Sequence, residues 1–523
     1  MRVSNFCLAT LAFAFGSIAS PSASPCSSRT TSVKTTSTST STSTSTSSPS
    51  VPIINIDGVV SGSLNATAWT LIYTYPLYIF ANWAGNVLRT VPVNTIFHQR
   101  QLASPNDPGV IKPNVDTLYS RVVLDLSQHD VVLTIPNVTD PKLYYNYPVI
   151  DLFGNVIAEI GSVNANLPGK YLIRRADDYL AAPGYEPSNT TTQLNTTYRG
   201  VVNLPTTYGT MLIRYLLFAN TTANLDIVHQ YQNASSLANV TRPAQAANFA
   251  SPNLTSLAPN GTFLGIDTSE KLLKLSAKLV PFNQPENYTD RYRVATTLAR
   301  AGLYDGSYTP QSGVNLTLAA AIANATITND TTNPANIRQE GNGWQLSTVP
   351  YQGNFGTNYG ARAYVAIAGY QQQTVKQTLY PGWKNLGFTS QITLQTGNSL
   401  LLTFSGKPKL KTSGFWSYTI YGADQYLVTN PLNRFEQGDR SFNLTYQDGS
   451  GLVYGPTANS SHDGPFQVLV QDVGTPPPAN WTGNWIPGSQ TFSFITRWYV
   501  PQDAMTNGSY VYPKVETVPA ITA

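Results

Sequence analysis

The side chains best suited to acid–base chemistry lie between residues 98 and 121. Imidazole, carboxyl and phenol groups can transfer protons, and a guanidinium group can bind an anionic substrate. In this stretch they are supplied by His98, Asp116, Tyr119 and Arg121. Because alternate residues of a strand face the same side, Tyr119 and Arg121 should share one face. These four residues are therefore the candidate catalytic residues of a hydrolase or lyase.

The residues before Tyr119 favour a fixed turn. Pro113 restricts the backbone to an extended conformation, and the Asn114 side chain can bond to nearby backbone groups. Two interpretations follow. One is a polar site, with Asn114 as a ligand-binding residue, that holds an anionic or sugar-like ligand. The other is a structural Asx turn beside a buried arginine.

Motifs for metals and common cofactors are missing from the sequence. The four histidines (His98, His129, His229 and His462) are widely separated, without HExxH, HxH or CxxC spacing. No GxSxG elbow, no GxGxxG after a strand and no GxxxxGK[ST] loop occurs. We therefore expect no metal site and no cofactor.

The composition excludes other classes of protein. Only 11% of the 523 residues are charged, against about 25% in typical globular chains, and the net charge is +4. A nucleic-acid binder would concentrate Lys and Arg, so no nucleic-acid partner is expected. The aromatic residues, at 11%, supply enough material for a folded core.

The N-terminal segment predicts export. Residues 1–23 have the order of a secretory signal peptide, with an apolar run at residues 6–18 that is too short to span a bilayer. Residues 24–50 are almost entirely Ser and Thr, which predicts a disordered linker. After cleavage Cys26 is the single cysteine left and cannot form an internal disulfide. We expect a secreted, extracellular protein without a transmembrane segment.

The remaining sequence predicts a mainly β fold with helical insertions. Helices are expected at residues 67–88, with a kink or break at Pro76, and at 225–231, 269–279, 292–303 and 361–370. Short β-like runs separated by Gly, Pro and Asn form two blocks: 121–126, 131–135, 143–150, 171–174 and 212–218, then 391–394, 400–404, 415–421, 442–446, 467–470 and 491–499. We expect two β-sandwich or jelly-roll-like domains, residues 51–235 and 351–516, joined by a partly helical segment, residues 236–350.

Residues 415–421 show the pattern of a central strand. Ser417, Thr419 and Tyr421 should face one side, and Trp416 and Tyr418 the other. Large apolar groups on both faces predict that both are covered. Since aromatic rings can also stack on sugars, Trp416 is a ligand-binding candidate.

Sequons for N-glycosylation are frequent, and nine of them lie between residues 220 and 329, which predicts a solvent-facing middle segment. The acceptor residues are Asn65, Asn137, Asn189, Asn195, Asn220, Asn233, Asn239, Asn253, Asn260, Asn287, Asn315, Asn324, Asn329, Asn443, Asn459, Asn480 and Asn507.

Several motifs resemble two families that occur together. The N-terminal block resembles domain-of-unknown-function family 1254 in KPNVDTLYSRVVLDLS (112–127), YYNYPVIDLFGNVIAEIGS (144–162) and GKYLI (169–173). The C-terminal block resembles family 1214 in ARAYVAIAGY (361–370), FWSYTIY (415–421), NPLNRF (430–435), NWIPG (484–488) and FSFITRWYVP (492–501).

The resemblance implies a secreted or envelope protein with two β-rich domains and carries no established activity. His98, Asn114, Asp116, Tyr119 and Arg121 match motif positions, as do the ligand-binding candidates Asp151, Arg362 and Arg434. We therefore expect a secreted N-glycoprotein with a ligand-binding or scaffold role in the extracellular space or wall. The alternative is an extracellular hydrolase or lyase. Either would bind a small polar or carbohydrate ligand.

Overall fold

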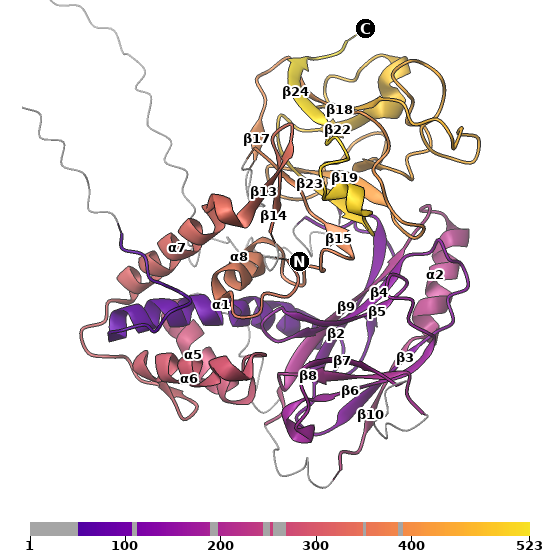
Figure 1. Cartoon of the computed structure of the whole chain (residues 1–523). Coiled ribbons are helices and arrows are strands. Elements are labelled where there is room, and N and C mark those ends of the chain that lie inside the picture. Colours follow the sequence, from indigo (N-terminus) through magenta and orange to yellow (C-terminus); the bar gives the residue numbers. More distant parts are fainter. Residues whose placement is uncertain are drawn as a thin grey trace, which may run out of the picture.

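The computed structural model of the chain describes residues 51–106, 112–188, 197–243, 252–254, 268–348, 352–384 and 391–522. The expected signal peptide, the Ser/Thr-rich linker and Cys26 lie outside the described residues. The described chain forms a helical module beside two β domains, with the C-terminal β domain stacked on the N-terminal one (Figure 1). The fold is mainly β with helices between the β regions, which confirms the predicted fold class.

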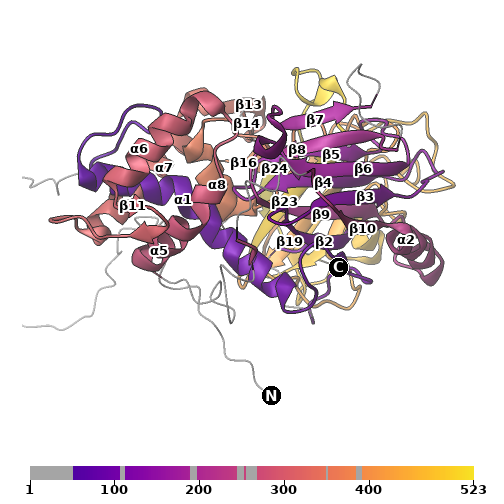
Figure 2. The same cartoon turned by 90° about the horizontal axis from the view of Figure 1, so that it is seen from below.

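The N-terminal β domain is a sandwich of two five-stranded sheets. The first sheet has the order β1 (Phe97–His98), β2 (Thr117–Asp125), β9 (Tyr208–Leu216), β4 (Tyr145–Asp151) and β5 (Val156–Gly161). The second has the order β10 (Ser236–Val240), β3 (Asp130–Ile135), β6 (Gly169–Arg175), β8 (Gly200–Leu204) and β7 (Gly184–Pro187). One hydrophobic core lies between them, and the helix α2 (Thr222–Ala234) flanks the sandwich (Figure 2).

The two faces of the first sheet differ in character. Alternate residues such as Leu118, Val122 and Ile213 belong to the hydrophobic core between the sheets. The opposite face presents polar side chains, among them Tyr119 and Arg214, which are register partners on β2 and β9. This alternation leaves a polar outer face that the C-terminal half of the chain covers.

The C-terminal β domain also packs sheets face to face around one hydrophobic core. One sheet has the order β15 (Thr378–Leu379), β23 (Thr491–Tyr499), β19 (Trp416–Gly422) and β20 (Glu436–Gly438), with β17 (Ile392–Thr393) also paired to β23. The other has the order β22 (Trp485–Gly488), β21 (Phe466–Asp472), β18 (Asn398–Phe404) and β24 (Lys514–Pro519). A small sheet of β13 (Ile337–Gly341), β14 (Trp344–Ser347) and β16 (Gly382–Trp383) lies beside them.

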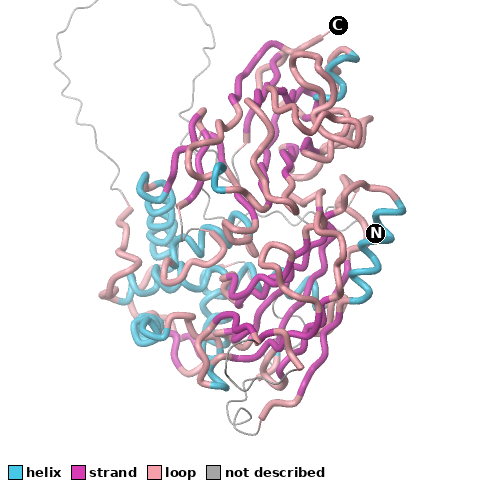
Figure 3. The backbone as a smooth tube through the Cα atoms, turned by 45° about the vertical axis from the view of Figure 1, so that its right-hand side comes forward, coloured by secondary structure: helices cyan, strands magenta, loops and turns pink. Residues whose placement is uncertain are grey.

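The helical module gathers elements that are far apart in the sequence. Its members are α1 (Ser63–Leu88), α5 (Ser269–Leu279), α6 (Arg291–Arg300), α7 (Leu316–Thr332) and α8 (Tyr359–Gly369), together with the hairpin β11 (Leu303–Tyr304) and β12 (Ser307–Tyr308). The helices gather on one side of the strands (Figure 3). The central helix α1 is buried along most of its length, because the other helices pack around it.

Local predictions differ from the structure at several points, and strands such as β5, β8 and β24 have no counterpart among the expected strands. Helix α1 is continuous through Pro76 and has no break there. The strand expected at residues 442–446 is absent as a described strand, and Thr445 and Tyr446 form isolated bridges instead. Helix α7 is not expected from the sequence, because its many Asn and Thr residues have low helix propensity.

Candidate anion-binding site between the β domains

A buried ion pair joins the two β domains at the start of β2. Asp116 is 1% exposed, and its carboxylate accepts hydrogen bonds from the Arg440 guanidinium and, at 2.7 Å, from the Ser417 hydroxyl. Both partners come from the C-terminal domain, one on β19 and one just after β20. The structure therefore places Asp116, a predicted catalytic residue, in a contact between domains.

Arg440 is the centre of a small acidic cluster. Its guanidinium lies 2.9 Å from Asp439 and 3.7 Å from Glu436, in addition to the contact with Asp116. Burial, reinforced by the Asp116 charge, raises the pKa of Glu436 to about 8. At neutral pH Glu436 is therefore mostly uncharged. The positive charge of Arg440 is balanced by its ion pairs with the carboxylates of Asp116 and Asp439.

Asn114 forms the Asx turn predicted for this segment. Its Oδ1 accepts hydrogen bonds from the backbone N–H groups of Asp116 at 2.6 Å and Thr117 at 3.0 Å. Its Nδ2 donates to the Tyr499 hydroxyl at 3.0 Å, across the domain boundary. The turn thus fixes the start of β2 and positions a tyrosine of β23.

Arg214, on β9, is the first of two buried arginines in this region. It is 5% exposed and donates to Gln373 Oε1 at 2.8 Å and to the Gln371 carbonyl oxygen at 3.3 Å. Its guanidinium lies 5.4 Å from the centre of the Tyr119 ring. Its Nε has no hydrogen-bond partner among the described residues.

Arg497, on β23, is the second. It is also 5% exposed, and it donates to the Thr419 hydroxyl and to the Tyr421 hydroxyl, each at 3.0 Å. Tyr421 in turn donates to the Pro113 carbonyl oxygen at 2.9 Å. Every recorded acceptor of Arg497 is therefore a neutral hydroxyl group.

Among the described residues, neither Arg214 nor Arg497 forms an ion pair with a carboxylate. Their neighbours are mainly phenol groups, and burial raises the pKa values of Tyr144, Tyr421 and Tyr499, so these groups are uncharged at neutral pH. Buried charges in proteins are normally paired. Two buried guanidinium groups with neutral partners therefore form a site suited to an anion, which they can bind with paired N–H donors.

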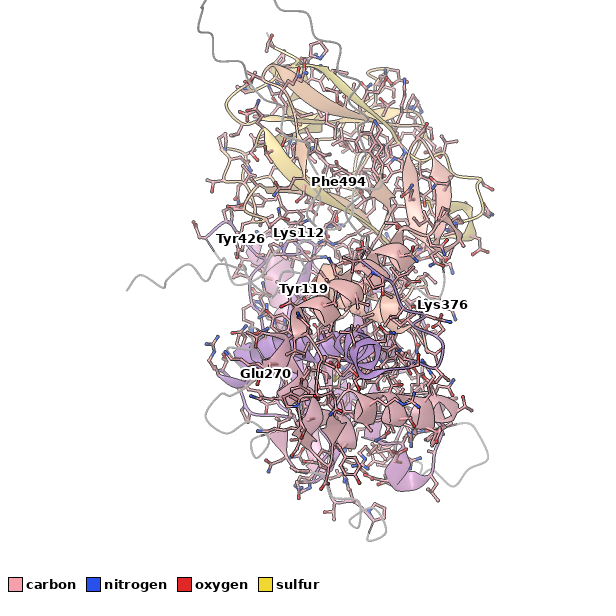
Figure 4. The ribbon with its side chains drawn as sticks, turned by 90° about the vertical axis from the view of Figure 1, so that its left-hand side faces the viewer. Lys112, Tyr119, Glu270, Lys376, Tyr426 and Phe494 are labelled. Carbon is pink, nitrogen blue, oxygen red and sulfur yellow. The ribbon has the colours of Figure 1, made fainter. Side chains whose placement is uncertain are left out.

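A third cation lies close to Arg497. Lys112 is 7% exposed, and burial together with the nearby Arg497 charge lowers the pKa of its ammonium group to about 8. Lys112 and Tyr119 both lie in the band between the C-terminal domain and the rest of the chain (Figure 4). Tyr119 is only half-buried, so this edge of the cluster reaches the surface. We define the anion site as Lys112, Tyr119, Arg214, Arg497 and Tyr499.

The structure does not bring His98 to this site. His98 is the register partner of Ser120 and lies 2.7 Å from its hydroxyl through Nδ1, so it belongs to the opposite face of the sheet from Tyr119. Burial, and to a lesser extent Arg100, lowers the pKa of His98 to about 4. Arg121 lies on the Tyr119 face of β2, two residues further along the strand.

Asp151 and Arg362 lie in a separate polar cluster, beside helix α1. The Asp151 carboxylate accepts hydrogen bonds from the backbone N–H groups of Phe153 and Asn155 and from the Asn155 side chain, and burial raises its pKa. Arg362 is 2% exposed, donates to the Tyr73 carbonyl oxygen and is enclosed by aromatic rings. Arg362 connects the helical module to the N-terminal sheet through the Phe153 ring, whereas Asp151 stabilises the turn after β4.

Trp416 and Arg434 lie away from the anion site. Trp416 is 1% exposed, belongs to the core of the C-terminal domain and donates to the Tyr454 hydroxyl. Arg434 donates to the carbonyl oxygens of Thr482 and Trp485 and so joins two loops.

The two arginines of the site were not among the candidates taken from the sequence. Each lies in an expected strand, at residues 212–218 and 491–499. A charged residue inside a run that is otherwise buried is the signal that could have found them, because such a residue needs a partner.

Most of the described sequon acceptors are exposed at the surface. None of those described is buried, which is compatible with glycan attachment. Asn189, Asn195 and Asn260 lie outside the described residues, and Asn65, Asn253 and Asn324 are partly buried. The exposed acceptors are Asn137, Asn220, Asn233, Asn239, Asn287, Asn315, Asn329, Asn443, Asn459, Asn480 and Asn507.

No group of three or more His, Cys, Asp or Glu side chains among the described residues is arranged to hold a metal ion. No helix in the same residues has the length and apolar character needed to cross a bilayer.

Fold and site together define a two-domain β protein with a helical module and a buried cationic site between the domains. Comparison with family models identifies both domains. Residues 93–239 match the family described as protein of unknown function DUF1254, and residues 389–503 match the protein of unknown function DUF1214. The chain therefore belongs to the proteins that carry a DUF1254 domain followed by a DUF1214 domain, which confirms the predicted resemblance.

A solved structure shares this architecture at low sequence identity. The crystal structure of the VPA0106 protein from Vibrio parahaemolyticus aligns with a TM-score of 0.52 and 15% identity, over 87% of this chain and 99% of that one. A putative uncharacterized protein from Burkholderia cenocepacia aligns with a TM-score of 0.37 and 11% identity, over 86% and 88%. The first likeness supports the fold alone. No curated protein matches the sequence.

Proposed function

We propose that this protein is a secreted, N-glycosylated binding protein that holds a small anionic ligand between its two β domains in the extracellular space or wall. The observation that carries the proposal is the pair of buried guanidinium groups of Arg214 and Arg497, whose recorded acceptors are neutral. Desolvated charges without a directly bonded counter-charge are unfavourable, and an anionic ligand would supply one.

The surrounding groups favour the same class of ligand. Tyr499 accepts a hydrogen bond from Asn114, and its own hydroxyl proton has no recorded acceptor among the described residues. A protonated phenol aimed at an anion adds a donor without adding charge. Lys112 adds positive charge at neutral pH, since its pKa of about 8 leaves it mostly protonated.

Export and glycosylation are supported by the sequence and by the surface. The signal-peptide pattern of residues 1–23 and the exposure of most described sequon acceptors support a secreted glycoprotein. Mass spectrometry of the secreted protein before and after removal of N-glycans tests this part. An intracellular, unglycosylated product from a host that glycosylates its secreted proteins would refute it.

The alternative, an extracellular hydrolase or lyase, would now have to use other residues. His98 and Tyr119 lie on opposite faces of the sheet, and Asp116 is held by Arg440. One observation favours an enzyme. The lowered pKa of Lys112 suits a general base at mildly alkaline pH. Turnover of a bound anion that disappears in Lys112→Met would favour it.

Binding is tested by thermal unfolding of the full secreted chain with small anions (succinate, phosphate, sulfate) and neutral sugars. A ligand at 100 times its Kd should stabilise the native state by about 2.7 kcal/mol. The anion-dependent shift should disappear in Arg214→Met and Arg497→Met. It should persist in the control Arg338→Gln, whose side chain is 44% exposed and remote from the site. Stabilisation by neutral sugars but by none of the anions would refute the proposal.

A further inference from the structure

Asn146, on β4, is a buried amide without partners. It is 0% exposed, yet neither its Nδ2 nor its Oδ1 has a hydrogen-bond partner in the part of the chain that the structure describes. The large majority of buried side-chain polar atoms in proteins are hydrogen-bonded, and an amide that lacks bonds on both sides is unusual. The neighbouring Tyr145 and Tyr147 side chains lie on the other face of the strand, in the core of the sandwich. Asn146 therefore presents a free donor and a free acceptor on the outer face.

The position of Asn146 connects it to the anion site. Asn146 and Arg214 are register partners on β4 and β9, and Arg214 and Tyr119 are register partners on β9 and β2. The three side chains form one row across adjacent strands, in which neighbouring Cβ atoms are about 5 Å apart. Arg214 contributes its own unpartnered Nε to this row. Unpaired groups of two kinds, cationic and amide, thus lie side by side.

The combination restricts the chemistry of the ligand. A guanidinium group needs an anionic acceptor, whereas a free amide needs a group that both accepts and donates. Sulfate or a simple carboxylate offers acceptors only and would leave Asn146 Oδ1 unpaired. A neutral sugar would leave the charge of Arg214 uncompensated, and an ammonium group would be repelled by Arg214 and Arg497. A carboxylate that carries a nearby hydroxyl group satisfies both requirements.

We infer that the ligand of this site is a small hydroxycarboxylate, with its carboxylate bound by Arg214 and its hydroxyl group bound by Asn146. The inference rests on the proposed anion-binding function and adds the class of ligand. The same chemistry occurs in free hydroxy acids and in the uronic acid units of polysaccharides. The deep burial of both side chains favours the free acid.

Calorimetric titration of the full chain with succinate and malate tests the inference, because these dianions differ by one hydroxyl group. Wild-type protein should bind malate about tenfold more tightly than succinate, as expected for one added hydrogen bond that satisfies a buried amide. Asn146→Leu should bind both with equal affinity, since it keeps the shape and Arg214 but loses the amide. Asn146→Asp should bind neither, because the new carboxylate neutralises Arg214. Galacturonate and polygalacturonate, titrated in parallel, distinguish the free acid from the polymer.

The outcomes of these titrations distinguish a failure of the hydroxycarboxylate inference from a failure of the proposed anion binding. Equal, Arg214-dependent binding of succinate and malate by the wild type would overturn the hydroxycarboxylate inference and leave anion binding intact. A preference for malate that survives in Asn146→Leu would overturn the role of Asn146. Failure of every anion to bind the wild type would remove the proposed function itself. If Asn146→Leu does not fold, binding by Asn146→Asp with wild-type affinity would equally overturn the inference.

Discussion

The clearest energetic contrast in this protein is between Arg440, whose charge is paired, and Arg497, whose charge is not. Arg440→Met would leave the buried Asp116 carboxylate and the partly exposed Asp439 carboxylate without the Arg440 counter-charge. Removing one partner of a buried ion pair costs about 3–5 kcal/mol, because the other charge remains desolvated. We therefore expect Arg440→Met to lower the free energy of unfolding by that amount.

Arg497→Met removes a buried charge that has no recorded carboxylate partner. It loses two hydrogen bonds to the neutral hydroxyls of Thr419 and Tyr421, each worth about 0.5–1.5 kcal/mol. Loss of the desolvated charge offsets part of this cost. In the absence of ligand, we expect Arg497→Met to destabilise the protein by about 2 kcal/mol or less, clearly below the effect of Arg440→Met.

Urea unfolding followed by tryptophan fluorescence measures both variants under the same conditions. The double variant Asp116→Asn/Arg440→Met provides a control, because neutralising Asp116 should recover part of the stability lost in Arg440→Met. A cost for Arg497→Met as large as that for Arg440→Met would refute the reasoning. It would mean that Arg497 has a strong partner in the ligand-free protein and that the site does not need an external anion.

Two further predictions concern the rest of the fold. Because the pKa of His98 is lowered from 6.5 to about 4 on folding, the unfolded state binds more protons in that window. Urea midpoints should therefore fall as the pH falls from 6.5 towards 4, and this fall should be smaller in His98→Gln; an equal fall would contradict the burial of His98. In Gly438→Ala, the added Cβ would lie 2.1 Å from the Trp416 carbonyl oxygen, so β20 must shift and stability should fall by about 1–3 kcal/mol. Gly474→Ala, where a Cβ meets only the Asp472 carboxylate at 3.0 Å, should change the urea midpoint far less, and equal effects would count against the clash.

Local sequence patterns were sufficient for many elements of the fold, although strands such as β5, β8 and β24 were not expected. The helix expected at residues 269–279 is observed as α5, and the strand expected at 415–421 is observed as β19, buried on both faces. Such elements follow from the period of their apolar residues, which is a local property. The same reasoning failed for α7, where Asn and Thr occupy positions that a typical helix fills with stronger helix formers.

The sequence by itself determined the family, the mainly β class, the Asx turn at Asn114 and the abundance of sequons. Only the tertiary structure decided the site. It placed His98 and Tyr119 on opposite faces of one sheet, paired Asp116 with Arg440, and brought Arg214 and Arg497 to one interface where, among the described residues, their hydrogen-bond acceptors are neutral groups. The physical reason is that the free energy of a buried charge depends on the groups that surround it in space. Those neighbours come from strands of different domains, and no local pattern in the chain records how the domains pack.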